Sequence, residues 1–204
     1  MRGLAGKRDY VRSLENRRDE EALSLLIECL CDESWYLREL AEEALFHMGE
    51  RSGAALVPLL DQGLWFSRAS AARVLGRIGH RSAMGPLVRL TEDPVETVRQ
   101  QAYATLATLA AQGGRVRLAW ELQQLPTERR AERLERLARV DRVLAERVRV
   151  LLDRDELRNA SDPEGLRDDA PWVRSCEEGR TWDEVPQSPP GRTHATSTEP
   201  ATHG

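Results

Sequence analysis

Apolar residues recur at intervals of three and four positions through most of residues 18–155. This spacing places them on one face of an amphipathic α-helix. In residues 36–49, Leu37, Ala41, Leu45 and Met48 form one such stripe. No region shows the alternation of apolar and polar residues that is typical of a half-buried strand. The pattern therefore predicts an all-α domain.

The apolar pattern itself repeats about every 30 residues. The aligned segments are YLRELAEEALFHMG (36–49), FSRASAARVLGRIG (66–79) and TVRQQAYATLATLA (97–110). Shorter helical segments are predicted between them, at 19–31, 52–61 and 82–91. A period of this size is that of a two-helix repeat, and one such unit cannot bury its apolar stripe alone. The sequence therefore predicts stacked helix pairs.

Each repeat also carries an Asp in its loop and an Arg early in its second helix. The pairs are Asp32 with Arg38, Asp61 with Arg68, and Asp93 with Arg99. The order of these residues resembles the HEAT-repeat family, and the second helices are similar to the short HEAT-like repeats named after phycobilisome lyases. The resemblance covers about residues 30–110. It implies a right-handed α-solenoid in which these Asp and Arg side chains form a structural ladder between neighbouring repeats.

The second unit departs from this pattern. Ser67 precedes its Arg68, and one additional residue separates Asp61 from Arg68.

A weaker fourth helix pair is predicted after Gly113 and Gly114, with a closing helix at 141–153. The chain is thus divided into an N-terminal extension or capping helix at 1–17, about four helix pairs at 18–155, and a tail at 156–204. A monomer is expected. The alternative is one long helix over 127–157 that forms a coiled-coil dimer, although Asp141 interrupts its apolar seam.

The tail is predicted to be disordered, because six of the ten prolines lie there among small polar residues. Trp172 and Trp182 stand out in this polar context. Three interpretations remain open for them: a short docking motif, a segment that folds back on the helices, or a tail without function.

The charge of the chain limits the classes of partner. The formal net charge is −4, which argues against bulk binding of nucleic acid. No apolar segment approaches the length of a membrane span or a signal peptide, so a cytoplasmic protein without membrane contact is expected. Three cysteines at irregular positions are expected to be reduced thiols.

Residues for catalysis are hard to nominate. The sequence contains no Gly-x-Ser-x-Gly, no phosphate-binding Gly-rich loop and no His-Glu-x-x-His. We therefore assign no catalytic, cofactor-binding or metal-binding residue, and we favour a non-enzymatic role. Two alternatives come from resemblance to other HEAT-like proteins: a nucleic-acid-binding or DNA-glycosylase-type protein, and a bilin-lyase-like protein.

The second helices of a solenoid line its concave face, which is the usual binding surface. Trp35 and Trp65 occupy equivalent loop-edge positions one repeat apart. They either seal the corners between the two helices of successive pairs or form a pair of aromatic anchors on one rim. The predicted partner-binding residues are Glu39, Glu43, Arg73, Arg77, Gln101, Tyr103, Trp35, Trp65, Trp172 and Trp182. We expect a scaffold or adaptor that binds another protein or a peptide through this face.

Overall fold

The computed structural model describes residues 4–14, 17–161 and 165–178, and every regular element within these ranges is helical. The elements are α1 (Leu4–Leu14), α2 (Glu20–Leu30), α3 (Trp35–Met48), α4 (Glu50–Leu56), η1 (Val57–Leu60), α5 (Trp65–Ile78), η2 (Arg81–Ala83), α6 (Met84–Leu90), α7 (Glu96–Leu109), η3 (Ala110–Gly114), α8 (Arg115–Gln123), α9 (Thr127–Val140), α10 (Arg142–Leu152), α11 (Asp155–Arg158) and α12 (Pro171–Glu177). The predicted all-α class is confirmed for this part of the chain.

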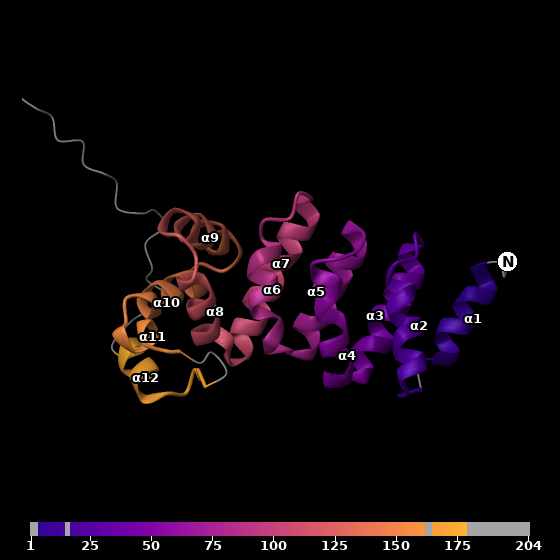
Figure 1. Cartoon of the computed structure of the whole chain (residues 1–204), viewed down its shortest axis with the longest axis horizontal. Helices are drawn as coiled ribbons and strands as arrows, with labels where there is room; N and C mark the ends of the chain where they lie inside the picture. The colour runs from indigo at the N-terminus through magenta and orange to yellow at the C-terminus, as the bar shows by residue number, and fades with distance from the viewer. Residues whose placement is uncertain (1–3, 15–16, 162–164, 179–204) are drawn as a thin grey trace, which may run out of the picture.

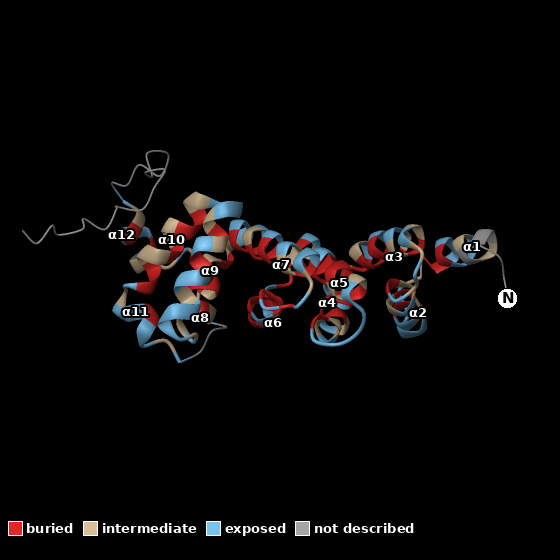
Figure 2. Ribbon diagram, turned by 90° about the horizontal axis from the view of Figure 1, so that it is seen from above, coloured by how far each residue is buried: buried red, intermediate tan, exposed pale blue. Residues whose placement is uncertain are grey.

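The helices follow one another in chain order along the long axis of the molecule (Figure 1). Seen from above, α1, α3, α5 and α7 form one row, and α2, α4 and α6 form a second row beside it (Figure 2). Helix α5 packs against α3 on one side and α7 on the other. Helices α1 to α7 therefore form two layers.

The repeated apolar positions form the core between these layers. Ala41, Ala71 and Ala102 are completely buried, as are Leu45 and Leu75. The small alanine side chains allow neighbouring helices to approach closely, and buried residues line the contact between the rows (Figure 2). The sequence period thus corresponds to a repeated packing position.

Local sequence explains where several helices begin and end. The Asp19 carboxylate accepts a hydrogen bond from the backbone N–H of Ala22 and caps α2. Gly79 ends α5 with a φ of 82°, a left-handed conformation that glycine adopts without a steric penalty. Pro58 lies in η1, where the helix begun by α4 tightens.

The alternative of one long helix over 127–157 is wrong. The chain turns at Asp141, whose φ and ψ of −146° and 104° are extended. Its carboxylate caps α10 through the backbone N–H of Leu144 at 2.8 Å. Helices α9 and α10 then pack against each other, so the apolar seam read along 127–157 is two separate packing faces.

The helical structure also continues past the predicted boundary at residue 155. Helix α12 packs on α10, and α11 packs on α8. Leu157 and Val173 are completely buried. The part of the expected tail that the structure describes, up to residue 178, is therefore a folded segment. None of the described helices is both long and apolar enough to cross a membrane.

Candidate functional site

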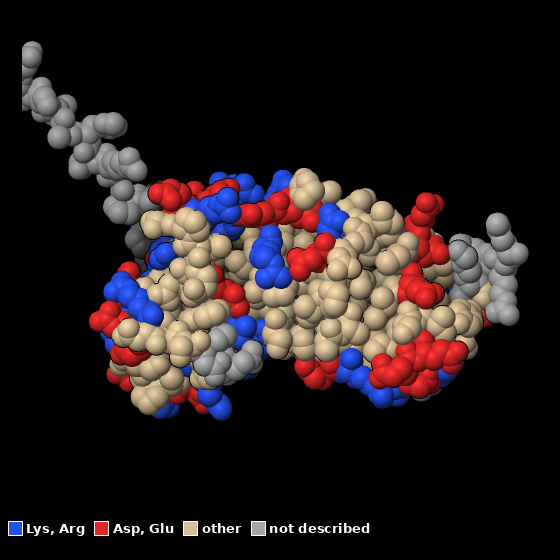
Figure 3. Space-filling view, in the orientation of Figure 1, with Lys and Arg blue, Asp and Glu red and all other residues tan. Residues whose placement is uncertain are grey.

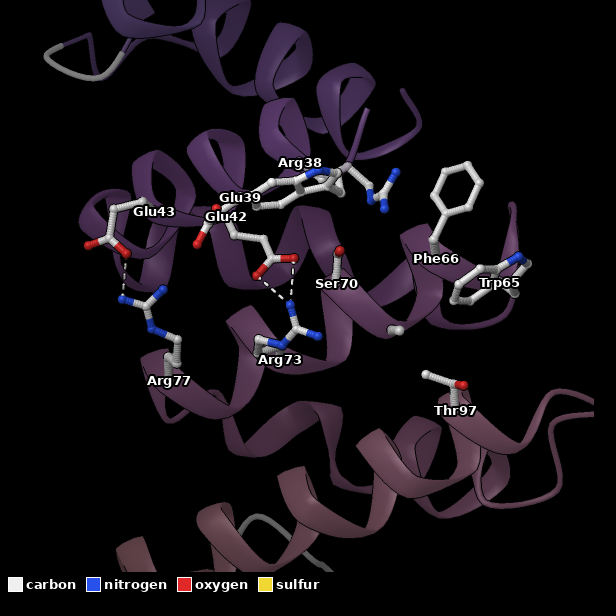
Figure 4. Close-up of a pocket in the computed structure, with 12 residues that line it drawn as sticks. Arg38, Glu39, Glu42, Glu43, Trp65, Phe66, Ser70, Arg73, Arg77 and Thr97 are labelled. Carbon is white, nitrogen blue, oxygen red and sulfur yellow. Dashed lines mark hydrogen bonds and ion pairs between the residues drawn. The ribbon is translucent and has the colours of Figure 1, made fainter. Parts of the chain in front are cut away.

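A groove of about 470 Å³ runs across the row formed by α3, α5 and α7 (Figure 4). Helix α3 supplies one wall and α5 the other, and Thr97 reaches it from the start of α7. Six of the predicted partner-binding residues line it: Trp35, Glu39, Glu43, Trp65, Arg73 and Arg77. The repeat places these side chains together because equivalent positions of successive second helices lie side by side.

One end of the groove is aromatic. Trp35 and Trp65 are the first residues of α3 and α5, and their exposed fractions are 68% and 46%. Each indole meets the ring of the next residue edge to face, Tyr36 at 5.8 Å and Phe66 at 5.6 Å between centroids. Large apolar side chains are rarely left so exposed without a binding role when they cluster.

The other end is charged but internally neutralised (Figure 4). Arg73 donates to both carboxylate oxygens of Glu42 at 2.9 Å, and the side chain of Glu42 is only 8% exposed. Arg77 pairs with Glu43 at 2.8 Å. Gln101 accepts a hydrogen bond from Arg73 at 3.3 Å. The acidic side chains of α3 and the basic side chains of α5 therefore form a row of acid–base pairs that joins the two helices.

The predicted Asp/Arg ladder takes a different form in the first units. The guanidinium of Arg8 lies over the Tyr36 ring at 5.0 Å, and that of Arg38 lies over Phe66 at 4.5 Å. These contacts join α1 to α3 and α3 to α5. Arg38 also donates to the backbone carbonyl of Asp32 at 2.8 Å. This hydrogen bond lies within one unit, across the loop that precedes α3.

Between the second and third units the ladder is a true ion pair. Arg68 donates to both oxygens of Asp93, at 2.7 and 3.0 Å, and also to the carbonyl of Gly63. Burial by itself raises the pKa of Asp93, but the hydrogen bonds from Arg68 and the Val95 N–H, with the charges of Arg68 and Arg99, bring that pKa below its ordinary value.

The remaining ladder residues donate to carbonyls of their own loops or form an ion pair at the surface. Asp61 pairs with Arg89 at 3.0 Å instead of with Arg68, and both side chains are more than half exposed. Arg99 donates to the carbonyls of Asp93 and Pro94. The spacing in the second unit explains the different partner of Asp61, because Gln62 occupies the position that Asp32 and Asp93 occupy in the other units.

Tyr103 is not a groove residue. It is 5% exposed and faces a small apolar space between α7, α8 and α9, beside Arg133 and Leu137. Burial raises the pKa of its hydroxyl. The equivalent positions, Glu42 and Ala72, are also buried, because this position faces the next unit along the stack. The prediction of an outward Tyr103 was wrong because the fourth helix pair covers it.

The two tryptophans predicted in the tail are separated. Trp172 is the second residue of α12 and packs, half-buried, against the core. This confirms, for Trp172, the interpretation of a segment that folds back. Trp182 lies outside the described residues.

Sequence reasoning missed the residue that fastens this segment. The Asp168 carboxylate accepts hydrogen bonds from the backbone N–H groups of Arg115 and Val116, at 3.1 and 2.9 Å, and from Nε of Arg115 at 2.9 Å. It therefore caps α8 from more than fifty residues away in the chain. Arg115 also pairs with Glu177 of α12. Only the lack of a capping side chain at Gly114 hinted at such a partner.

The lining of the groove consists of aromatic, charged and small side chains. In the ranges that the structure describes, no group of three His, Cys, Asp or Glu side chains is placed to hold a metal ion. No protein-family model matches the chain, and no curated protein is significantly similar to it.

Proposed function

We propose that this chain is a HEAT-like, right-handed α-solenoid that acts as a scaffold or adaptor and binds a segment of a partner protein in the groove of α3, α5 and α7. Two features support the solenoid: the period of about 30 residues in the sequence and the two rows of helices in the structure.

The observation that carries the proposal is the exposed pair Trp35 and Trp65. Tryptophan is the residue most enriched in binding hot spots, because its ring supplies a large contact area with little entropy to lose. Here two indoles stand at equivalent positions on one edge of a groove. The self-neutralised pairs Arg73–Glu42 and Arg77–Glu43 continue the groove beyond them.

Affinity capture with the tagged full-length chain tests this proposal. We expect a defined protein partner that is lost from the Trp35→Ala/Trp65→Ala variant, because the variant removes the exposed anchors. Val140→Ala provides a matched control, since Val140 is a 50% exposed apolar residue on α9, away from the groove. The proposal is wrong if the double variant captures the same partner as the native chain.

A second variant, Trp182→Ala, separates the groove from the chain beyond α12. Capture that survives this change but not Trp35→Ala/Trp65→Ala assigns binding to the groove. Staining of the captured material for nucleic acid checks the nucleic-acid alternative, which predicts nucleic acid without a protein partner.

A further inference from the structure

We infer that the aromatic end of the groove recognises basic side chains: the partner segment carries two Arg or Lys residues whose cationic groups stack on Trp35 and Trp65, with Glu39 as the counter-charge. This inference rests on the proposed function and specifies the chemistry of the partner.

The same recognition already occurs within the molecule. Arg8 stacks on Tyr36 and Arg38 on Phe66, and Arg77 stacks on Phe46 at 4.0 Å. In the described residues no guanidinium lies over Trp35 or Trp65, although indole is the ring that binds cations best. The repeat thus places an occupied ring and an open ring next to each other at the start of α3 and again at the start of α5.

Negative charge is available beside one of the open rings, that of Trp35. Glu39 lies one turn after Trp35 on α3, and therefore on the same side of the helix. Neither Glu39 nor the exposed Glu33 forms an ion pair with any residue that the structure describes. At the third equivalent position, Glu96 takes the place of the tryptophan at the start of α7, but its carboxylate is already paired with Arg99.

The cations at this edge are already engaged. Arg38 and Arg99 donate to loop carbonyls, and Arg68 donates to Asp93 and to a carbonyl. Over the surface as a whole, carboxylates gather at the α1–α3 end, whereas Arg and Glu alternate over α9 (Figure 3). A basic segment is therefore the complementary partner for the aromatic end.

The start of a helix favours an anion, which is the main argument against this inference. An anion would need free cationic side chains to hold it. Of the three arginines that line the groove, Arg73 and Arg77 are held by Glu42 and Glu43, whereas Arg38 donates to two loop carbonyls and stacks on Phe66. Glu39, which lines the groove without an ion pair to any described residue, has the sign that attracts a cation.

The repeat also sets the spacing of the two basic residues. Packed helices lie about 8–10 Å apart, so the helix axes that carry the two tryptophans are separated by one such step. A polyproline-II segment advances about 3.1 Å per residue with three residues per turn, which puts positions i and i+3 on one side, about 9 Å apart. We therefore expect basic residues three positions apart in an extended segment.

Three fluorescein-labelled peptides without tryptophan test the inference with the full-length protein. Their centres are Arg-Pro-Pro-Arg, Gln-Pro-Pro-Gln and Glu-Pro-Pro-Glu, and binding is measured by fluorescence polarisation at low and moderate salt. We expect the Arg peptide to bind best, and the Trp35→Ala/Trp65→Ala variant to lose about tenfold in affinity for it.

Glu39→Gln should lower the affinity for the Arg peptide about threefold and reduce its salt dependence, since the change removes the counter-charge. Glu135→Gln is the matched control, because Glu135 is an exposed carboxylate on α9. Val140→Ala controls for the tryptophan changes.

The outcomes separate this inference from the proposed function. If the Glu peptide binds as tightly as the Arg peptide and depends on the tryptophans, the basic partner is wrong but the groove still binds a segment. If the Arg peptide binds equally to the double tryptophan variant, general attraction to an acidic chain explains it and the inference fails. If no peptide binds while partner capture still requires Trp35 and Trp65, the inference alone is overturned.

Discussion

The described structure contains two pairs of tryptophans, and the two halves of the molecule use them differently. In the α3–α7 half, Trp35 and Trp65 are largely exposed. In the α8–α12 half, Trp120 donates its indole N–H to the carbonyl of Ala160 at 3.1 Å, and Trp172 packs against the core. The same residue type therefore offers a surface in one half and fastens chain segments together in the other.

The difference follows from how neighbouring elements are joined. In the α3–α7 half each step of the stack has its own arginine contact, on Phe66 or on Asp93, so the tryptophans are not needed for cohesion. In the α8–α12 half one irregular segment, residues 165–178, is joined to α8 by Asp168 and to the core by Trp172. A surface tryptophan in a regular stack is thus free to bind a partner.

The largest expected effect is that of Asp168→Ala. The change removes the cap of α8 and leaves the half-buried Arg115 with Glu177 as its main partner. Loss of a cap costs about 1 kcal/mol and loss of a half-buried charge partner about 2, so we expect about 3 kcal/mol in total. Chemical denaturation measures the free energy of unfolding, and hydrogen exchange should show faster exchange at residues 165–178.

Asp168→Asn is the control for this prediction. Its amide oxygen can still accept one backbone N–H bond, so it should be less destabilising than Asp168→Ala. Equal protection of residues 165–178 in the native chain and in Asp168→Ala would show that the cap does not fasten this half.

The α3–α7 half of the fold could be predicted from the sequence, because the residues that recur with its period are the ones that pack between the helices. Ala41, Ala71 and Ala102 recur at matching positions, and each is completely buried. The α8–α12 half could not be predicted in the same way. Asp168 acts on the N–H groups of Arg115 and Val116, and nothing in the local sequence links residues so far apart.

The candidate site was predictable in part for the same reason. Equivalent positions such as Trp35 and Trp65 fall on one edge wherever helices stack in register. Tyr103 was misplaced because its surroundings depend on the fourth helix pair, whose sequence pattern is weak. The stacking of Arg38 on Phe66 was missed because the Asp/Arg spacing offered a simpler partner.

The next largest effect is expected for Asp93→Asn, which tests the ion-pair step of the stack. The side chains of Asp93 and Arg68 are 5% and 16% exposed, so Arg68 would lose the charge that compensates for its burial. We expect a loss of about 2 kcal/mol at neutral pH, less than for a fully buried pair because Arg68 keeps the carbonyl of Gly63. Denaturation at pH 7 measures this loss.

The acid dependence of the same variant provides an independent check. The pKa of Asp93 is lower in the folded protein than its ordinary value of 3.8, so its stabilising contribution is complete above that value and is lost as the pH falls below it. The difference in stability between the native chain and Asp93→Asn should therefore narrow from about pH 5 to pH 3. A constant difference over this range would mean that Asp93 does not carry the shifted pKa.

The smallest effect on stability is expected for substitutions of two adjacent rings, Phe66 and Trp65. They test most directly whether the exposed tryptophans are free of a role in packing. Phe66→Leu removes the ring under Arg38 and should cost about 0.5–1 kcal/mol in the free energy of unfolding. Trp65→Leu removes a 46% exposed ring over which no described guanidinium lies, and should cost less than Phe66→Leu. In peptide binding the order should reverse, since the open ring is the one proposed to meet the partner. If both variants lose the same stability and neither affects binding, Trp65 belongs to the cohesion of the stack, and the distinction between occupied and open rings is wrong.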